Sequence, residues 1–201
     1  MKYFRLSGHL FFGIFLVFSV LFYLERTVFL DGAYYLFDII QSGTPNISGR
    51  YSALLTQILP WLAILLGLPL KVVLLLYSIS FTLVFYLIYL LCVYRLKSDA
   101  AGIAIILSLC LCVRDSFYYP VSEIFLGLVL SALFFAWLYH QKDRQTSRLR
   151  WWGTAMLLIL LCYYAHAVTV FTMLFSLGFY MIDQKKWSDK RIYLLAGGIV
   201  L

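Results

Sequence analysis

Long apolar runs alternate with short polar segments along almost the whole chain. The runs expected to cross a membrane are residues 8–24, 71–94, 100–113, 124–139, 151–164 and 168–182. A bilayer core about 30 Å thick requires about 20 apolar residues per helix, which the longest runs provide. Residues 192–201 begin a further helix but reach only half a crossing, so the sequence is expected to be the N-terminal part of a longer core. The pattern predicts an all-α fold, a polytopic transmembrane helical bundle of about 6–7 spans.

The stretch between the first two long runs has a different pattern. It is too polar at its start to cross a bilayer and too aromatic for an ordinary loop. At about 100° per residue, four of its side chains fall within about 60° of one another: Asp31, Tyr35, Asp38 and Ser42. We therefore predict a short helix on the membrane surface, with apolar side chains in lipid and two carboxylates facing water or a pocket. A plain interfacial anchor with solvated acids is the simpler alternative.

The placement of basic residues predicts the topology. The basic segments are the N-terminus and residues 95–97, 142–150 and 185–191. The positive-inside rule puts all of them in the cytoplasm, which requires an odd number of crossings between residues 25 and 95. Residues 51–67 are therefore expected not to cross, and their polar first half and Pro60 suit a helix lying in the outer leaflet. Residues 25–70 would then form an external loop with two interfacial helices.

Composition narrows the class of protein further. With 64% hydrophobic and 12% charged residues, the chain is not an ordinary soluble domain. Its net charge of +7 is explained by the basic loops, so no nucleic-acid partner is predicted. The four cysteines lie in apolar runs and are expected to be packed or lipid-facing thiols. The sequence has no glycine-rich phosphate loop, nucleotide fingerprint or paired-histidine motif, and no metal site is predicted.

Under this topology, polar groups from several segments collect on the outer face. They are Asp31, Asp38, Arg50, Arg114, Asp115, Glu123 and His166. Ionisable groups at membrane depth are costly and are functional candidates by default. The alternative is that Arg114 pairs with Asp115 or Glu123 merely to neutralise a short loop.

The same segments resemble the GT-C superfamily of membrane glycosyltransferases. Residues 31–35, DGAYY, stand where that family has an Asp-Glu-x-x-Tyr-like motif, and residues 43–69 resemble its second loop helix. Residues 114–123 resemble its second external loop, and residues 165–167 resemble a later His-Pro or Lys-Pro turn. The chain departs from the family pattern by lacking the second acid, the Pro-Pro pair and the proline after His166.

The resemblance implies a single transmembrane domain over residues 1–201, a truncated GT-C-like core of an uncharacterised bacterial branch. It further implies residence in the bacterial inner membrane with a cytoplasmic N-terminus, and sugar transfer from a polyprenyl-phosphate donor at the outer face. Asp31 is then the expected catalytic base, and Arg50 and Arg114 are expected to bind phosphate. The other expected substrate-binding residues are Asp38, Asp115, Glu123 and His166. No cofactor is expected besides the lipid-linked sugar, while a divalent metal and the oligomeric state are left open.

Two other classes fit parts of the pattern. A non-enzymatic transporter, flippase or envelope-assembly component would usually show polar or broken helices at the midplane, often in repeated halves. Here the span interiors are nearly free of charge and no repeat is present, which favours chemistry at one face. A polysaccharide polymerase or ligase would also gather arginines outside, but would be expected to have larger external loops.

Overall fold

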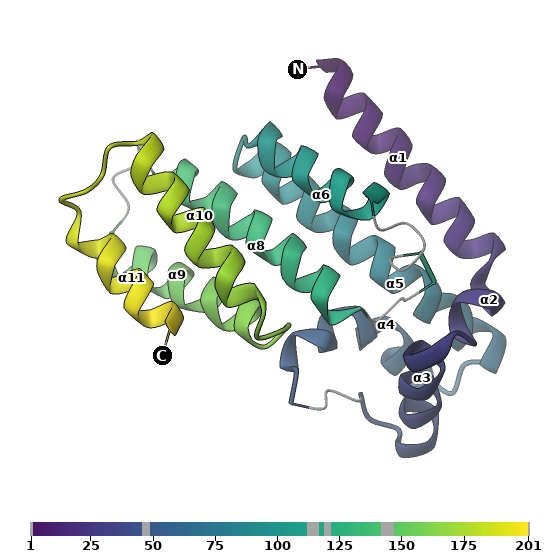
Figure 1. Ribbon diagram of the computed structural model, residues 1–201. Helices are drawn as coiled ribbons and strands as arrows, with labels where there is room; N and C mark the ends of the chain where they lie inside the picture. Colours follow the sequence, from purple (N-terminus) through teal and green to yellow (C-terminus); the bar gives the residue numbers. More distant parts are fainter. Residues whose placement is uncertain (1, 46–48, 112–116, 119–121, 142–146, 201) are drawn as a thin grey trace.

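The computed structural model describes residues 2–45, 49–111, 117–118, 122–141 and 147–200, and this part of the chain is helical without a strand (Figure 1). In chain order its elements are α1 (Lys2–Leu21), α2 (Tyr23–Thr27), α3 (Leu30–Ser42), the 3-10 turn η1 (Tyr51–Ala53), α4 (Leu54–Leu65), α5 (Leu70–Leu90), the π-helical turn η2 (Leu91–Arg95), α6 (Asp99–Leu111), α8 (Glu123–His140), α9 (Arg148–Tyr163), α10 (Thr169–Asp183) and α11 (Lys190–Val200). The prediction of an all-α fold is confirmed.

Helices α5 and α8 form the centre of the bundle. α5 packs against α1, α2 and α4, whereas α8 packs against α6, α9 and α10. The two central helices also meet directly, and the main core includes Phe81 and Phe85 from α5 and Phe134 from α8. Such helices are apolar around most of their circumference because every side of them meets another helix or lipid.

The described part of the chain has the build of a membrane protein. Within it, three helical segments are long and apolar enough to cross a membrane: Phe4–Leu21, Leu70–Arg95 and Glu123–His140. Shorter apolar helices cover Tyr51–Leu65, Asp99–Leu111 and Thr169–Asp183. Large apolar side chains also point away from the bundle; Phe171 and Phe175 of α10 are 73% and 74% exposed. Exposure of such side chains to water is unfavourable, whereas lipid around the bundle would cover them.

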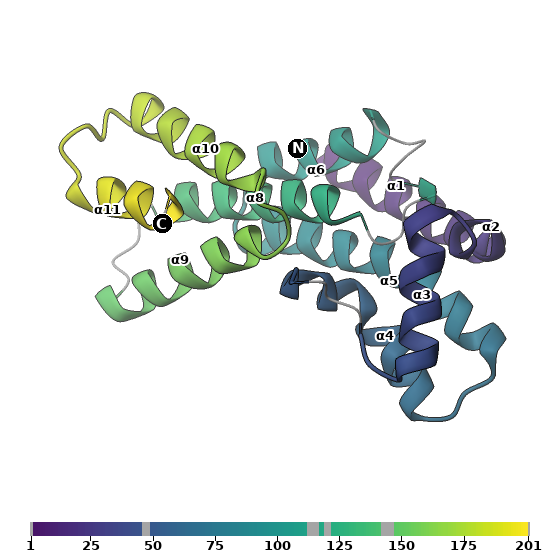
Figure 2. The ribbon, with the colours of Figure 1, turned by 60° about the horizontal axis from the view of Figure 1, so that its bottom comes forward.

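The two ends of the bundle differ in character. In Figures 1 and 2 the N-terminus, the α5–α6 turn, the start of α9 and the α10–α11 turn lie toward one end. Helices α2, α3 and α4 gather at the opposite end. The N-terminus and the described basic segments 95–97, 148–150 and 185–191 therefore share one end, and the helices of the predicted external loop share the other.

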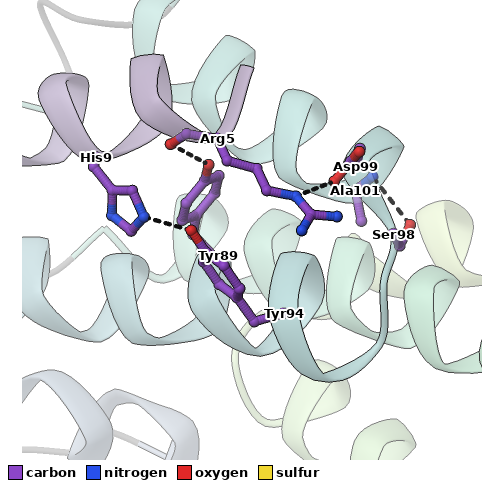
Figure 3. Close-up of polar contacts among 7 residues, drawn as sticks. All are labelled: Arg5, His9, Tyr89, Tyr94, Ser98, Asp99 and Ala101. Carbon is purple, nitrogen blue, oxygen red and sulfur yellow. Dashed lines mark hydrogen bonds and ion pairs between the residues drawn. The ribbon is translucent and has the colours of Figure 1, made fainter. Parts of the chain in front are cut away.

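At the basic end, α1 is tied to α5 and α6 by a cluster of polar side chains (Figure 3). Arg5 Nε donates to Asp99 Oδ1 at 3.3 Å. His9 Nε2 lies 2.6 Å from the hydroxyl of Tyr94, and His9 Nδ1 lies 2.7 Å from the hydroxyl of Tyr86. Tyr94 belongs to η2, and a π-helical turn changes the direction of the side chains within it. This cluster fixes the packing of three helices far from the polar groups of α3.

Candidate functional site

The short helix predicted after the first apolar run is confirmed as α3, and its surface has three faces. The buried face consists of Gly32, Leu36 and Ile39. The exposed apolar face consists of Tyr34, Phe37 and Ile40. The polar face, at the helical spacing predicted above, consists of Asp31, Tyr35 and Asp38. The expectation that all the apolar side chains face lipid is therefore wrong for Leu36 and Ile39, because they pack on the protein instead.

Contacts with α4 and α5 fix the orientation of α3. Leu36 and Ile39 belong to a small second core with Ala63 of α4 and Tyr77 of α5. The hydroxyl of Tyr77 donates to the carbonyl of Gly32 at 2.8 Å. Trp61 Nε1 of α4 donates to the carbonyl of Gly43, which ends α3 in the left-handed conformation with φ of 69°. The polar face of α3 is therefore turned toward the start of α8.

Glu123, the first residue of α8, is the centre of the candidate site. Its Oε1 lies 2.8 Å from Nη1 of Arg50 and accepts a hydrogen bond of 2.9 Å from the hydroxyl of Tyr35. The Glu123 side chain is 14% exposed and the Arg50 side chain is 41% exposed. The carboxylate is thus held inside the site, while its cationic partner reaches the surface.

Tyr35 is the donor in its bond to Glu123, and its environment keeps it protonated. Burial and the hydrogen bond to Glu123 raise the pKa of the Tyr35 hydroxyl to about 12. The charges of Glu123 and Asp31 also raise this pKa, whereas that of Arg50 lowers it. At neutral pH Tyr35 therefore holds Glu123 in place and does not act as a base.

Asp31 and Asp38 lie on either side of Tyr35 along α3. Asp31 is exposed and Asp38 is half-buried. Asp31 lies one turn before Tyr35 on the same face of α3, and its charge contributes to the raised pKa of Tyr35. The predicted acids of α3, Arg50 and Glu123 thus belong to one end of the bundle. The positions of Arg114 and Asp115 lie outside the described residues.

His166 lies at the same end of the bundle, in the turn between α9 and α10. Its Nδ1 accepts a hydrogen bond of 3.2 Å from the backbone nitrogen of Val168. This turn is joined to η1, because the Ser52 backbone nitrogen donates to the Tyr164 carbonyl at 3.3 Å. The Ser52 hydroxyl also donates to the carbonyl of Leu161 at 2.6 Å. The chain just after Arg50 is therefore anchored beside the turn that carries His166.

Arg26 is a buried cation that the sequence analysis did not select. Its Nε donates to the hydroxyl of Ser78 at 2.8 Å and its Nη2 to the Ser78 carbonyl at 3.0 Å. Its Nη1 donates to the carbonyl of Phe117, and the guanidinium lies 4.6 Å from the centre of the Phe117 ring. Burial lowers the pKa of Arg26 to about 9, so the side chain stays charged at neutral pH. In the sequence Arg26 is only a charged residue two positions after the apolar run 8–24, and nothing in that pattern indicates that it is buried.

The ring of Phe117 also lines an apolar groove of about 560 Å³ between α1, the end of α6 and residues 117–118. The lining residues are Phe11, Ile14, Phe15, Phe18, Phe22, Cys110, Phe117 and Tyr118. Phe15 and Phe22 contact the Phe117 ring edge-on, with centroid separations of 5.4 and 6.2 Å. The groove is therefore almost wholly aromatic, and Arg26 stacks on one of the rings that form its wall.

Among the described residues, no three His, Cys, Asp or Glu side chains gather as a metal site would require. The site is instead an ion pair with a tyrosine and further carboxylates on the adjoining face of α3. Comparison with protein-family models, curated proteins and solved structures finds no match to this chain. The resemblance to the GT-C superfamily therefore stays a prediction, and the function has to be inferred from the geometry of the site.

Proposed function

We propose that this protein is an integral membrane glycosyltransferase of the GT-C type. It would move a sugar from a polyprenyl-phosphate carrier to an acceptor at the outer face of the membrane. The observation that carries the proposal is the arrangement of Arg50, Glu123 and Tyr35, with Asp31 one turn before Tyr35 on the same face of α3. Arg50 is a surface cation held by the Glu123 carboxylate, and it can bind phosphate. Asp31 is a second, accessible carboxylate, and it can act as a base.

In the proposed reaction, Asp31 accepts the proton of the acceptor hydroxyl. The acceptor oxygen then bonds to the anomeric carbon of the sugar, and the bond from that carbon to the phosphate oxygen breaks. The electron pair of the broken bond leaves on the polyprenyl phosphate, where Arg50 stabilises the added negative charge. A guanidinium has five N–H donors, so Arg50 can engage Glu123 through Nη1 and phosphate through the others. The lipid-linked sugar is the donor, and this scheme involves no further cofactor.

Glu123 and Tyr35 have a positioning role in this scheme. Glu123 is less exposed than Arg50 and is fixed by the Tyr35 hydroxyl, so it can hold the guanidinium in one orientation. Asp38, on the polar face of α3, and His166, in the α9–α10 turn, are the proposed contacts for sugar or acceptor. Arg114 and Asp115, which precede α8 in the chain, keep their proposed roles in phosphate and acceptor binding.

The aromatic groove beside α1 supports the proposal that the sugar donor is linked to a lipid. Its wall is almost entirely apolar, its volume is about 560 Å³, and it lies on the outside of the bundle where a lipid tail would arrive from the bilayer. Arg26 adds a positive charge behind the wall at Phe117. An anionic headgroup at this end of the groove would be favoured by that charge even without direct contact.

The proposal includes a membrane topology of six or seven spans with a cytoplasmic N-terminus, in the inner membrane of a bacterium. Helix α4 has 12 residues, a length of about 18 Å, and contains Pro60. Helices α6 and α10 are of similar length, so the support for a non-crossing α4 comes from its packing. Both α4 and α3 pack against the first turns of α5. This packing supports an arrangement in which residues 25–70 stay on the outer side.

Single-cysteine labelling tests the topology. The four native cysteines are replaced, and single cysteines are placed at the exposed positions Thr44 and Leu66 and at Ser98 and Ser147. An impermeant thiol reagent should label the first two in intact cells and the last two only after permeabilisation. Cytoplasmic labelling at Leu66 would mean that α4 crosses, and the proposed outer site would be split.

Transfer by the purified protein tests the activity. The protein is reconstituted in liposomes with radiolabelled polyprenyl-phosphate sugars and an envelope extract as acceptor, and loss of label from the lipid is followed. Asp31→Asn should abolish transfer with insertion unchanged. Glu25→Gln, which removes an exposed acid from nearby α2, should retain it. Full activity of Asp31→Asn would exclude Asp31 as the base.

A transporter or flippase is the second candidate, and one observation bears on it. A line of buried polar groups runs from Arg26 between α1 and α5: the Ser78 hydroxyl donates to the Ser19 carbonyl at 2.7 Å, and the Ser19 and Thr82 hydroxyls are 2.9 Å apart. These groups bond to one another, which is typical of helix packing in membranes more than of a solute path. In the liposome assay, movement of the intact donor lipid across the bilayer without loss of its sugar would favour transport.

A further inference from the structure

A second polar surface lies at the end of the bundle opposite the candidate site. It is formed by the start of α9 and the turn between α10 and α11, which lie at the same end in Figures 1 and 2. The two parts are in contact, because the guanidinium of Arg191 lies 5.6 Å from the centre of the Trp151 ring. We call this surface the basic end patch. Its described basic residues are Arg148, Arg150, Lys185, Lys186, Lys190 and Arg191.

Within the part of the chain that the structure describes, the positive charge of the patch is only partly neutralised. Asp189 accepts two hydrogen bonds of 3.1 Å from the Nε and Nη2 atoms of Arg191, and these bonds lower the pKa of its carboxyl. Asp183, the last residue of α10, accepts a bond of 2.9 Å from the Tyr139 hydroxyl. Arg148 and Arg150 are exposed, and no acid lies in the first turn of α9. Cations at the start of a helix oppose its dipole, so these two arginines do not serve to stabilise α9.

Large apolar side chains stand among these cations. Leu149 is 85% exposed between Arg148 and Arg150, and Trp187 is 56% exposed between the two lysines and Asp189. Tyr193, one turn into α11, is 54% exposed. A free anion, or a protein surface that is only acidic, would match the cations but would leave these side chains in water. The headgroup region of a bilayer accommodates both, because aromatic and cationic side chains lie there together.

We propose that the basic end patch binds the phosphate headgroup of an anionic phospholipid, such as phosphatidylglycerol, in the leaflet opposite the candidate site. Arg148 and Arg150 contact the phosphate, while Leu149 and Trp187 lie against the glycerol and the upper acyl chains. The lysines of the α10–α11 turn and Lys190 add attraction at longer range. This lipid would hold α9 and the α10–α11 turn at a fixed depth, and the inference does not depend on the proposed sugar transfer.

Thermal unfolding with added lipid tests the proposal. The intact protein in a neutral detergent is mixed with phosphatidylglycerol, with phosphatidylcholine or with inorganic phosphate, and the unfolding midpoint is measured. Phosphatidylglycerol should raise the midpoint through binding to the folded state, and the other two should not. A rise with inorganic phosphate alone would overturn the lipid assignment, as would an equal rise with phosphatidylcholine.

Matched double variants locate the site. Arg148→Gln with Arg150→Gln should remove at least half of the midpoint shift caused by phosphatidylglycerol. Arg95→Gln with Lys97→Gln removes the same charge from exposed positions at the same end of the bundle and should leave the shift unchanged. Arg148→Lys with Arg150→Lys keeps the charge and should retain most of the shift, which separates lost binding from impaired folding. An equal loss in the Arg95 and Lys97 variant would overturn the proposal by indicating attraction to the whole basic end.

The result of the lipid-binding test can be distinguished from the result of the sugar-transfer test. Asp31→Asn should abolish sugar transfer and keep the full response to phosphatidylglycerol. If the wild-type protein responds to phosphatidylglycerol but shows no transfer activity, the proposed function alone is contradicted. If it shows transfer activity without a lipid response, this inference alone is contradicted.

Discussion

Arg50 Nη1 and Glu123 Oε1 meet at 2.8 Å, which joins the residue before η1 to the first residue of α8. The ion pair therefore links the loop that follows α3 to the core of the bundle. Tyr35 binds the same carboxylate oxygen from a third segment, α3. Because side chains from three separate parts of the chain meet at Glu123, this residue is the most informative one to change first.

Glu123→Gln should reduce sugar transfer by about tenfold or more, because Arg50 loses its charged partner and with it a fixed position. The effect on stability should be small, about 1 kcal/mol or less, because Arg50 is 41% exposed and such pairs contribute little. Transfer rates in liposomes and unfolding midpoints in detergent measure the two effects separately.

Asp99→Asn is the matched control for Glu123→Gln. It breaks a second partly exposed ion pair between distant described segments, Arg5 to Asp99 at 3.3 Å, at the opposite end of the bundle. The side chain of Asp99 is 17% exposed, close to the 14% of Glu123. Similar losses of transfer in both variants would show that Glu123 acts through stability, which contradicts a role in the site.

Tyr35→Phe should lower the stability by about 1 kcal/mol at neutral pH, because it removes one hydrogen bond to a carboxylate. The pKa of Tyr35 is raised in the folded protein from 10.0 to about 12, so the folded state favours the protonated hydroxyl. The stabilisation is therefore fully present below about pH 10 and is lost as the pH rises toward 12.

The measurement is the difference in unfolding midpoint between wild type and Tyr35→Phe as the pH is raised, together with the difference in tyrosinate absorbance. The midpoint difference should shrink in the pH range where the extra hydroxyl of the wild type ionises. A hydroxyl that ionises near the ordinary tyrosine pKa would contradict the buried bond to Glu123.

Arg26→Met should destabilise the protein by about 2–4 kcal/mol, because the carbonyl groups of Ser78 and Phe117 lose their donor in a buried place. Arg26→Lys should destabilise the protein less than Arg26→Met does, because the positive charge is kept. It should still be less stable than the wild type, because a lysine cannot reach several acceptors in the same fork geometry. The unfolding midpoint in detergent is the measurement, and Arg95→Met, at an exposed position in η2, is the control. An unchanged midpoint in Arg26→Met would mean that Arg26 is not the buried link between α2, α5 and Phe117.

Gly127→Ala should destabilise the contact between α8 and α10 by about 1–3 kcal/mol, because the added methyl group meets a packed neighbour. A Cβ at Gly127 would lie 2.2 Å from Cγ2 of Thr169. The control is Gly178→Ala within α10, where a Cβ would meet nothing within 4 Å and alanine favours the helix by about 1 kcal/mol. The two variants should therefore shift the unfolding midpoint in opposite directions, and equal shifts would contradict the close approach of α8 and α10.

The local pattern of the sequence was sufficient for the class of fold and for several candidate residues. Apolar runs predict helices because hydrophobicity and length are local properties, and the helical spacing of Asp31, Tyr35 and Asp38 correctly gave one face of α3. The same reasoning was wrong about Leu36 and Ile39, which meet α4 and α5 rather than lipid. An apolar side chain has the same appearance in a sequence whether protein or lipid covers it.

The pairing of charged groups was decided by the tertiary structure. The sequence did not identify Arg50 and Tyr35 as partners of Glu123, because they lie far away in the chain. In the folded protein Glu123 binds both, and the expected partner Arg114 lies outside the described residues. The burial of Arg26 likewise depends on Ser78 and Phe117, which only the packing of α2 against α5 brings to it. The sequence by itself therefore determined the helices and their apolar character, because these depend on neighbours along the chain. The identity of each ionic and hydrogen-bonding partner depends on which helices pack together, and only the tertiary structure decided that.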